Sequence, residues 1–354
     1  VGRSCKASGP VKARTDWCDS LRGAPTSPGA IYGCHGSASP RSQILFGLSG
    51  SSMPLESQLL AAQALDRSHA HSIQILDTVT RYWSYPSENP AAKVIVFIHG
   101  YRGNHHGLEA IAGALNDFHV IIPDLPGFGE STPFANEHSV EQYAHWLDVF
   151  IKTLSPKRKP ILLGHSFGSI ICSAYASKSD DIELLILENP VSAPALKGPN
   201  APITKIAQGF FALAGGLPLR LGEWLLKSWP MVRGMSILMT KTWNRDLRKW
   251  VHAQHDANFN DFANRRVAIE GYKASISNNV SDYAASFRVP TLLIIGSRDD
   301  ITSPKQQFAM ASKIQVPHAI SQHMGVGHLT HYEIPKEVAE DIRQFVSQQS
   351  LGSA

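Results

Sequence analysis

The stretch "PILLGHSFGSI", residues 160–170, places a serine between two glycines at the end of an apolar run. At average glycine and serine usage of about 7%, a Gly-x-Ser-x-Gly match arises by chance in roughly one chain in eight of this length. The apolar residues before the pentapeptide predict a buried strand, and those after it predict a helix. Whether Ser166 is a reactive residue or an ordinary turn residue therefore depends on its surroundings.

The composition indicates a globular protein with a substantial core. Of the 354 residues, 43% are hydrophobic and 18% are charged. The formal charge of +4 comes from residues 1–52, and the remaining residues have equal numbers of basic and acidic side chains. The globular part thus has no general electrostatic reason to bind nucleic acid, and we expect no nucleic-acid partner.

Residues 1–52 differ from the rest of the chain. They are rich in Gly, Ser and Pro, show no clear periodicity, and precede the first methionine, Met53. They also hold Cys5, Cys18 and Cys34, whose spacing matches no familiar metal-ligand pattern, although a disulfide or metal role remains an alternative. We expect a disordered leader, or residues outside the natural product if translation starts at Met53. The segment lacks the apolar stretch of a signal peptide.

No apolar run is long enough to span a bilayer. The nearest, "IAQGFFALAGGLPL" at 206–219, is too short and contains Gly-Gly and Pro218. The fourth cysteine, Cys172, lies in the apolar stretch after Ser166, where we expect it to be part of the core. A body without disulfides is typical of a cytoplasmic protein.

The order of apolar segments predicts an α/β fold with a doubly wound, mostly parallel sheet. A strand or hairpin is expected at 72–85, and helical patterns separate the later strands. One of these helices, 139–154, begins with Ser139 and Gln142 in capping-box register. The buried strands are expected at 93–100, 119–127, 160–164, 182–190 and 289–297, followed by a weaker one at 318–324, and the last helix at 335–349.

The alternation stops at about residue 190 and resumes at about residue 286. The residues between contain four of the seven tryptophans and a cluster of methionines, and they predict several short helices. We therefore expect a core of residues 53–189 and 286–350 that is interrupted by a helical insertion at 190–285. No internal repeats are visible.

Three residues with complementary chemistry each follow a different predicted strand, in the order Ser166, Asp299 and His328. In an open α/β sheet, ligands bind beyond the carboxyl ends of the strands, where these residues would meet. A serine hydroxyl needs a base to become nucleophilic. A histidine supplies that base near neutral pH when a carboxylate fixes its tautomer. The glycines beside Ser166 fit a strand-to-helix turn too tight for side chains.

With these motifs, residues 72–349 resemble the α/β-hydrolase superfamily. The matching segments are "HGYRG", "DLPGFGES", "GHSFG", "PTLLIIGSRDD" and "GVGHLTHYEIP", in that order. The resemblance implies that residues 190–285 form a helical cap over the pocket. It also implies Ser166 as nucleophile, Asp299 as acid, His328 as base, the backbone N–H groups of Tyr101 and Phe167 as oxyanion hole, and His99 with Gly100 as the supporting loop.

Alternatives for these roles lie close by in the sequence. Asp300 follows Asp299, and Glu188 ends a predicted strand where some members of the superfamily have their acid. His323 and His331 flank His328, but they lack its sequence context. The adjacent histidines "HH" at residues 105–106 offer a metal site as another alternative, but no third ligand at suitable spacing is evident. A Gly-x-Gly-x-x-Gly motif after a first strand would indicate a dinucleotide site, and the sequence has no such motif. We therefore expect no cofactor, and we expect no metal.

A serine at this turn argues against haloalkane dehalogenases and most epoxide hydrolases, which use aspartate there. The leading hypothesis is a serine hydrolase that cleaves a carboxylic ester of a small, largely apolar substrate. The alternatives are a thioesterase, a C–C bond hydrolase or a cofactor-free haloperoxidase-like enzyme, and a non-catalytic binding protein is a further one. The segment "PLRLGEWLLKSWPMVRGM" could contact a membrane surface. The sequence leaves the oligomeric state open.

Overall fold

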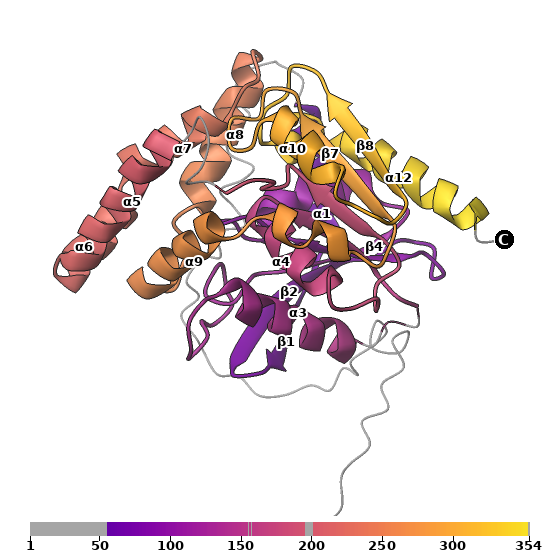
Figure 1. Cartoon of the computed structure of the whole chain (residues 1–354), viewed down its shortest axis with the longest axis horizontal. Coiled ribbons are helices and arrows are strands. Elements are labelled where there is room, and N and C mark those ends of the chain that lie inside the picture. Colours follow the sequence, from indigo (N-terminus) through magenta and orange to yellow (C-terminus); the bar gives the residue numbers. More distant parts are fainter. Residues whose placement is uncertain (1–54, 155, 157, 195–200, 353–354) are drawn as a thin grey trace, which may run out of the picture. The chain divides into compact units, whose positions relative to one another are not determined.

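The computed structural model describes residues 55–154, 156, 158–194 and 201–352, all within one compact unit. The leader expected at residues 1–52, with its three cysteines, lies outside the described residues. Figure 1 shows the described part as a twisted sheet with helices packed around it.

A single sheet of eight strands forms the centre of the described part. Its order is β1-β2-β4-β3-β5-β6-β7-β8, with β2 antiparallel to both of its neighbours and every other pair parallel. The expected doubly wound, mostly parallel sheet is therefore confirmed. The strands are β1 (His69–Ile75), β2 (Thr78–Tyr85), β3 (Val94–Ile98), β4 (His119–Pro123), β5 (Ile161–His165), β6 (Leu185–Glu188), β7 (Thr291–Gly296) and β8 (His318–His323).

Helices cover both faces of this sheet, which explains why its central strands are continuously apolar. Alternate strand residues such as Tyr85 and Phe97 share a core with α1 (Glu56–Asp66), α2 (Glu109–Ala114) and α12 (Pro335–Gly352). On the other face, α3 (Val140–Leu154) packs against α4 (Phe167–Ala176). There Trp146 of α3 donates its indole N–H to Thr80 of β2 over 2.9 Å.

Helix α1 was not expected from the sequence. Its buried face consists of only three small or medium residues, Ser57, Leu60 and Ala64, so its apolar periodicity is weak. The helix is held by close backbone packing against α2, where an added Cβ on Gly113 would lie 1.9 Å from the carbonyl oxygen of Leu60.

Short helical segments complete the core. Three of them come after the strands β3, β7 and β8, and the other two come directly before β7. These segments are η2 (His105–Leu108), η3 (Val280–Asp282), η4 (Ala284–Ser286), α10 (Pro304–Ala311) and α11 (Thr330–Glu333).

Among the described residues, five α-helices lie between β6 and β7, as the sequence predicts for the helical insertion. They are α5 (Ala201–Gly216), α6 (Leu219–Leu226), α7 (Trp229–Met239), α8 (Arg245–Asn258) and α9 (Arg265–Ser277). In Figure 1 they lie together at the left, with α12 at the right. The exact limits expected for this insertion stay a prediction.

The helical insertion exposes several large apolar side chains, among them Ile206, Leu213, Trp224, Trp229 and Ile237. Contact of this surface with a membrane stays a prediction. Within the described ranges, every helix is too short or too polar to cross a bilayer.

The packing of α1 on α2 can be tested with one methyl group. Replacing Gly113 by Ala forces its Cβ into the backbone of Leu60, and we expect the free energy of unfolding to fall by about 1–3 kcal/mol. The matched control is Gly209→Ala in α5, where no heavy atom lies within 4 Å of the new Cβ. That change should raise stability by up to about 1 kcal/mol. Urea unfolding followed by circular dichroism measures both, and a G113A protein as stable as the wild type would contradict this packing.

Candidate active site

Ser166 lies on a sharp turn between β5 and α4. Its backbone has φ 52° and ψ −116°, a conformation that is unusual for a residue with a side chain. The glycines on either side have no room for a Cβ. At Gly164 it would lie 2.5 Å from the carbonyl oxygen of Gly168, and at Gly168 it would lie 2.2 Å from that of Ile98. This is the steric requirement that the pentapeptide led us to expect, and it presents Ser166 at the carboxyl edge of the sheet.

Two hydrogen bonds join Ser166, His328 and Asp299 in a line. His328 Nδ1 lies 2.9 Å from Asp299 Oδ2, and His328 Nε2 lies 2.8 Å from Ser166 Oγ. Because a carboxylate only accepts, Nδ1 carries the proton and donates it to Asp299. Nε2 is then left to accept a hydrogen bond from the serine hydroxyl. The structure thus brings together the three residues that the sequence singled out from three different strand ends.

The carboxylate of Asp299 is held in place from several sides. Its Oδ1 accepts from the backbone N–H of Ile301 at 2.8 Å and of Thr302 at 3.3 Å. Its Oδ2 accepts from the side-chain amides of Asn189 at 3.2 Å and Gln307 at 3.3 Å, besides His328. These hydrogen bonds fix the orientation of the Asp299 carboxylate relative to His328.

The alternative acids and bases have other partners. Asp300 forms an ion pair with Lys241. His323 Nε2 lies 2.7 Å from Asp341 Oδ2. Two further alternatives, Glu188 and His331, pair with each other below the site, with Glu188 Oε1 3.3 Å from His331 Nδ1. The hydrogen-bonded path to Ser166 therefore runs through Asp299 and His328.

The loop after β3 lies directly beside the serine. An added Cβ on Gly100 would lie 3.2 Å from the Cβ of Ser166. His99 holds this loop, because its Nε2 accepts from the N–H of Leu125 and its Nδ1 lies 2.9 Å from the carbonyl oxygen of Gly100. Burial lowers the pKa of His99, which favours the neutral ring that this bonding needs. The oxyanion role expected for the N–H groups of Tyr101 and Phe167 stays a prediction.

Arg102, in the same loop, is a structural residue that the sequence analysis missed. Its side chain is fully buried and its backbone has φ 62°. The guanidinium donates to the carbonyl oxygens of Leu226 and Phe259, each at 2.9 Å, and to Asn260 Oδ1 at 2.8 Å. Leu226 ends α6 and Phe259 caps α8, so Arg102 satisfies carbonyl groups that a helix leaves free at its C-terminus. The sequence feature that could have pointed to Arg102 was an arginine inside the "HGYRG" motif.

Asn189 is a second residue that the sequence analysis missed. It follows β6 directly and has φ 44°, a backbone conformation that asparagine tolerates better than most residues. Its side-chain amide donates to Asp299 and, at 3.2 Å, to the carbonyl oxygen of Gly327. Its Oδ1 accepts from the hydroxyl of Thr330 at 2.6 Å. Asn189 thus links the loop of Asp299 to the loop of His328. The sequence feature that could have pointed to it was a polar residue immediately after a buried strand.

A cavity of about 50 Å³ opens beside Ser166, with room for a few water molecules. It lies between the core and the helical insertion. Its wall combines apolar side chains with several histidine rings: Leu108, His165, Met239, His255, Phe259, His328, Leu329, His331 and Tyr332 line it together with Ser166 and the loop after β3.

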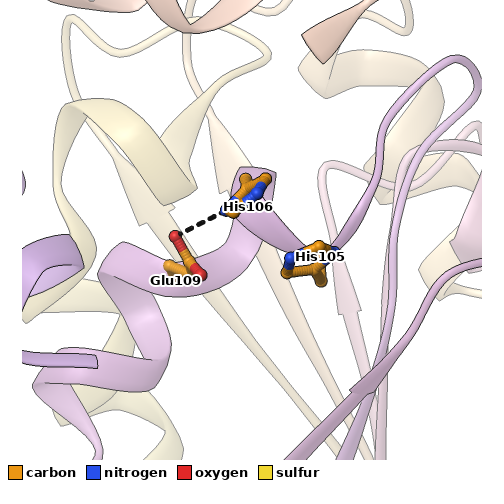
Figure 2. Close-up of side chains that lie close together, drawn as sticks. All are labelled: His105, His106 and Glu109. Carbon is orange, nitrogen blue, oxygen red and sulfur yellow. Dashed lines mark hydrogen bonds and ion pairs between the residues drawn. The ribbon is translucent and has the colours of Figure 1, made fainter. Parts of the chain in front are cut away.

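The expectation that the histidine pair 105–106 has no third ligand is wrong. Figure 2 shows Glu109 joined to His106, because the turn of η2 brings a residue three positions later next to that ring. The ligand atoms of His105, His106 and Glu109 lie within 4.8 Å of one another. All three groups are already bonded. His105 Nδ1 lies 2.9 Å from Asp124 Oδ1, His106 Nδ1 lies 3.1 Å from Glu109 Oε2, and Tyr85 donates to Glu109 Oε1 at 3.2 Å.

A doubly wound sheet with a serine at a tight strand-to-helix turn and a Ser–His–Asp path defines the α/β hydrolases. The chain belongs to this family, since the family model described as alpha/beta hydrolase fold matches residues 93–333. It is similar to Lipase 1 of Psychrobacter immobilis, with 26% identity over 264 residues, 73% of this chain and 78% of the relative. Lipase 3 of Moraxella sp. (strain TA144) is 25% identical over 264 residues, 73% of this chain and 79% of the relative. The chain is therefore a lipase- or esterase-like hydrolase.

The fold is also shared with solved structures at lower identity. An esterase from Exiguobacterium antarcticum superposes with a TM-score of 0.65 at 18% identity, over 79% of this chain and all of that structure.

The bridging position of Asn189 can be tested by Asn189→Ala. The change removes one of the donors to Asp299 Oδ2 and the side-chain donor to the carbonyl oxygen of Gly327, which costs about 1–3 kcal/mol, and puts alanine at a positive φ. If Asn189 positions the Asp299 and His328 loops, kcat should fall about tenfold, equivalent to about 1.4 kcal/mol, with little change in KM. The control is Asn278→Ala, which removes only a bond to Ala274 within the insertion. Equal kcat values for the two variants would contradict the positioning role.

Proposed function

We propose that this protein is a serine hydrolase that cleaves a carboxylic ester of a small, largely apolar substrate through an acyl-enzyme on Ser166. The observation that carries the proposal is the continuous hydrogen-bonded path from Ser166 through His328 to Asp299 at the wall of a cavity. The two relatives that match this chain over most of their own length are lipases by name, which supports an ester as the substrate.

In the proposed reaction, Ser166 Oγ attacks the ester carbonyl carbon while His328 Nε2 takes the hydroxyl proton. Asp299 stabilises the imidazolium that forms and keeps its tautomer. His328 then returns the proton to the leaving alcohol, and the C–O bond breaks to leave an ester on Ser166. A water molecule, deprotonated by the same imidazole, releases the acid and restores the serine.

The negative oxygen of the tetrahedral intermediate needs donors that are in place before it forms. We assign this role to the backbone N–H groups of Tyr101 and Phe167. Phe167 is the first residue of α4, so the positive end of a helix points toward the same place. Losing one such donor typically costs about 10²–10³ in rate.

The same groups could act on other acyl derivatives. A thioester or a C–C bond next to a ketone would be cleaved by the same nucleophile and base, and in a haloperoxidase-like reaction hydrogen peroxide would attack the acyl-enzyme in place of water. We favour an oxygen ester because of the relatives' names, and a substrate panel of p-nitrophenyl esters beside acyl-CoA thioesters separates the two main choices. Turnover of acyl-CoA with no turnover of any ester would overturn our choice. The cytoplasmic location and the absence of a nucleic-acid partner stay predictions.

The role of Ser166 is tested by Ser166→Ala. We expect hydrolysis to fall by at least about 10³-fold and labelling by a fluorophosphonate probe to disappear. The control is Ser173→Ala on the same helix, because the Ser173 hydroxyl is buried without a hydrogen-bond partner in the described part of the chain. That variant should keep both labelling and activity. A folded wild-type protein that the probe leaves unlabelled at Ser166 would favour a non-catalytic binding protein.

The size of the cavity predicts a preference for short acyl chains. We expect p-nitrophenyl acetate and butyrate to give higher kcat/KM values than esters of eight or more carbons. Met239→Ala removes side-chain volume from the cavity wall and should shift the optimum toward longer chains. Met235→Ala, on the same helix but outside that wall, serves as control. An unchanged chain-length profile for M239A would show that the acyl chain binds elsewhere.

A further inference from the structure

A second group of ionisable side chains lies beneath the Ser166 turn. Glu188 ends β6 and is fully buried, and it pairs in strand register with His165, the residue before Ser166. His331, on α11, approaches from the other side, with its ring centroid 4.1 Å from that of His165. The path from Ser166 through His328 to Asp299 uses none of these three residues.

The contacts within this group are close but poorly directed for hydrogen bonding. His165 Nδ1 lies 3.3 Å from Glu188 Oε2, and His331 Nδ1 lies 3.3 Å from Glu188 Oε1. His165 Nδ1, Glu188 Oε2 and His331 Nδ1 are buried atoms that lack a hydrogen-bond partner in the described part of the chain. Three buried polar atoms left without partners at one place require an explanation, since such groups are costly.

We propose that His165, Glu188 and His331 form a binding site for a divalent transition-metal ion, with Zn²⁺ as the best match. Two histidines and a glutamate are a known zinc-binding set. Their three ligand atoms lie within 4.8 Å of one another. In a tetrahedral zinc site with bonds of about 2.0–2.1 Å, neighbouring ligand atoms lie about 3.3–3.4 Å apart. Each imidazole nitrogen lies 3.3 Å from one oxygen of Glu188, His165 Nδ1 from Oε2 and His331 Nδ1 from Oε1, so a small rotation of the carboxylate brings one oxygen to both nitrogens.

The electrostatics of the group favour a cation. The carboxylate oxygen and the two imidazole nitrogens each offer a lone pair to a metal ion. Both rings line the cavity, where a water molecule can complete the coordination.

The cluster in Figure 2 provides the contrast. There His105 is bonded to Asp124, and Glu109 is bonded to both His106 and Tyr85. A metal ion would have to break these hydrogen bonds, whereas in the other cluster it would bind His165 Nδ1, Glu188 Oε2 and His331 Nδ1, which make no hydrogen bond among the described residues. The two clusters share their residue types, so they form a matched pair for experiment.

A metal ion at Glu188 would regulate the hydrolysis, a consequence that rests on the proposed function. The His165 ring lies 5.4 Å from that of His328. A divalent cation held by His165 disfavours the positive charge that His328 must accept when it takes the serine proton. We therefore expect Zn²⁺ to inhibit ester hydrolysis reversibly, and a chelator to restore it.

Metal binding is measured first in the Ser166→Ala protein, so that the result does not depend on activity. After treatment with a chelator, the protein is dialysed against micromolar Zn²⁺ and its metal content is determined by mass spectrometry. We expect about one Zn²⁺ per chain, lost in S166A/Glu188→Gln and retained in S166A/Glu109→Gln. Loss in the Glu109 variant with retention in the Glu188 variant would place the metal in the other cluster and overturn the proposal.

A measurement on the unmutated protein covers the case in which the Glu188 variant does not fold. Co²⁺ should give the intense visible absorption of a four-coordinate site, and Zn²⁺ should displace it. Absence of both Zn²⁺ uptake and this spectrum would show that Glu188 only pairs with two imidazoles, and it would overturn the proposal. Zn²⁺ binding without ester hydrolysis by the unmutated protein would instead contradict the proposed function and leave the metal site standing.

Discussion

The close approach of α4 to the end of β3 is the constraint on which the site depends. The backbone at Gly168 lies so near the carbonyl oxygen of Ile98 that an added Cβ would be only 2.2 Å away. This contact lets the chain reverse within the few residues around Ser166, and it forces the serine into a backbone conformation that an open loop would avoid. The strain is offset by the buried strand before the turn and the buried helix after it, both of which are covered by apolar packing.

The same contact brings three chain segments to one point. Gly100 meets Ser166 because β3 and β5 are neighbours in the sheet, and His99 keeps that loop against the segment after β4. Arg102 then extends the loop into the helical insertion by donating to carbonyl oxygens at the ends of two of its helices. Burying a guanidinium is costly, and burial lowers its pKa, so its hydrogen bonds to helix ends matter for holding it. The position of the insertion is therefore coupled to the loop that faces the serine.

Two carboxylates at neighbouring strand ends have separate partners. Asp299 faces His328, whereas Glu188 lies between His165 and His331. Asn189 separates them, since its backbone turns into the left-handed region directly after Glu188 and its amide reaches Asp299. The hydroxyl of Thr330 contacts both Glu188 and Asn189 and so ties the His328 loop to this arrangement. Asp299 is thus placed for the proton path through His328, and Glu188 is placed for the cation that we propose.

The sequence by itself determined the sheet, the helical insertion and the three residues that meet at the site. Continuous apolar runs, glycines at a tight turn and polar residues after each strand are local signals, and parallel strands bring their carboxyl ends to one edge. Helix α1 carried too narrow an apolar face to be seen, and the third ligand beside His105 and His106 depended on the turn of η2. Only the tertiary structure decided which acid faces His328, how Arg102 is satisfied and which polar atoms remain without partners. These outcomes depend on distances between segments far apart in the chain, and no local pattern encodes a distance of that kind.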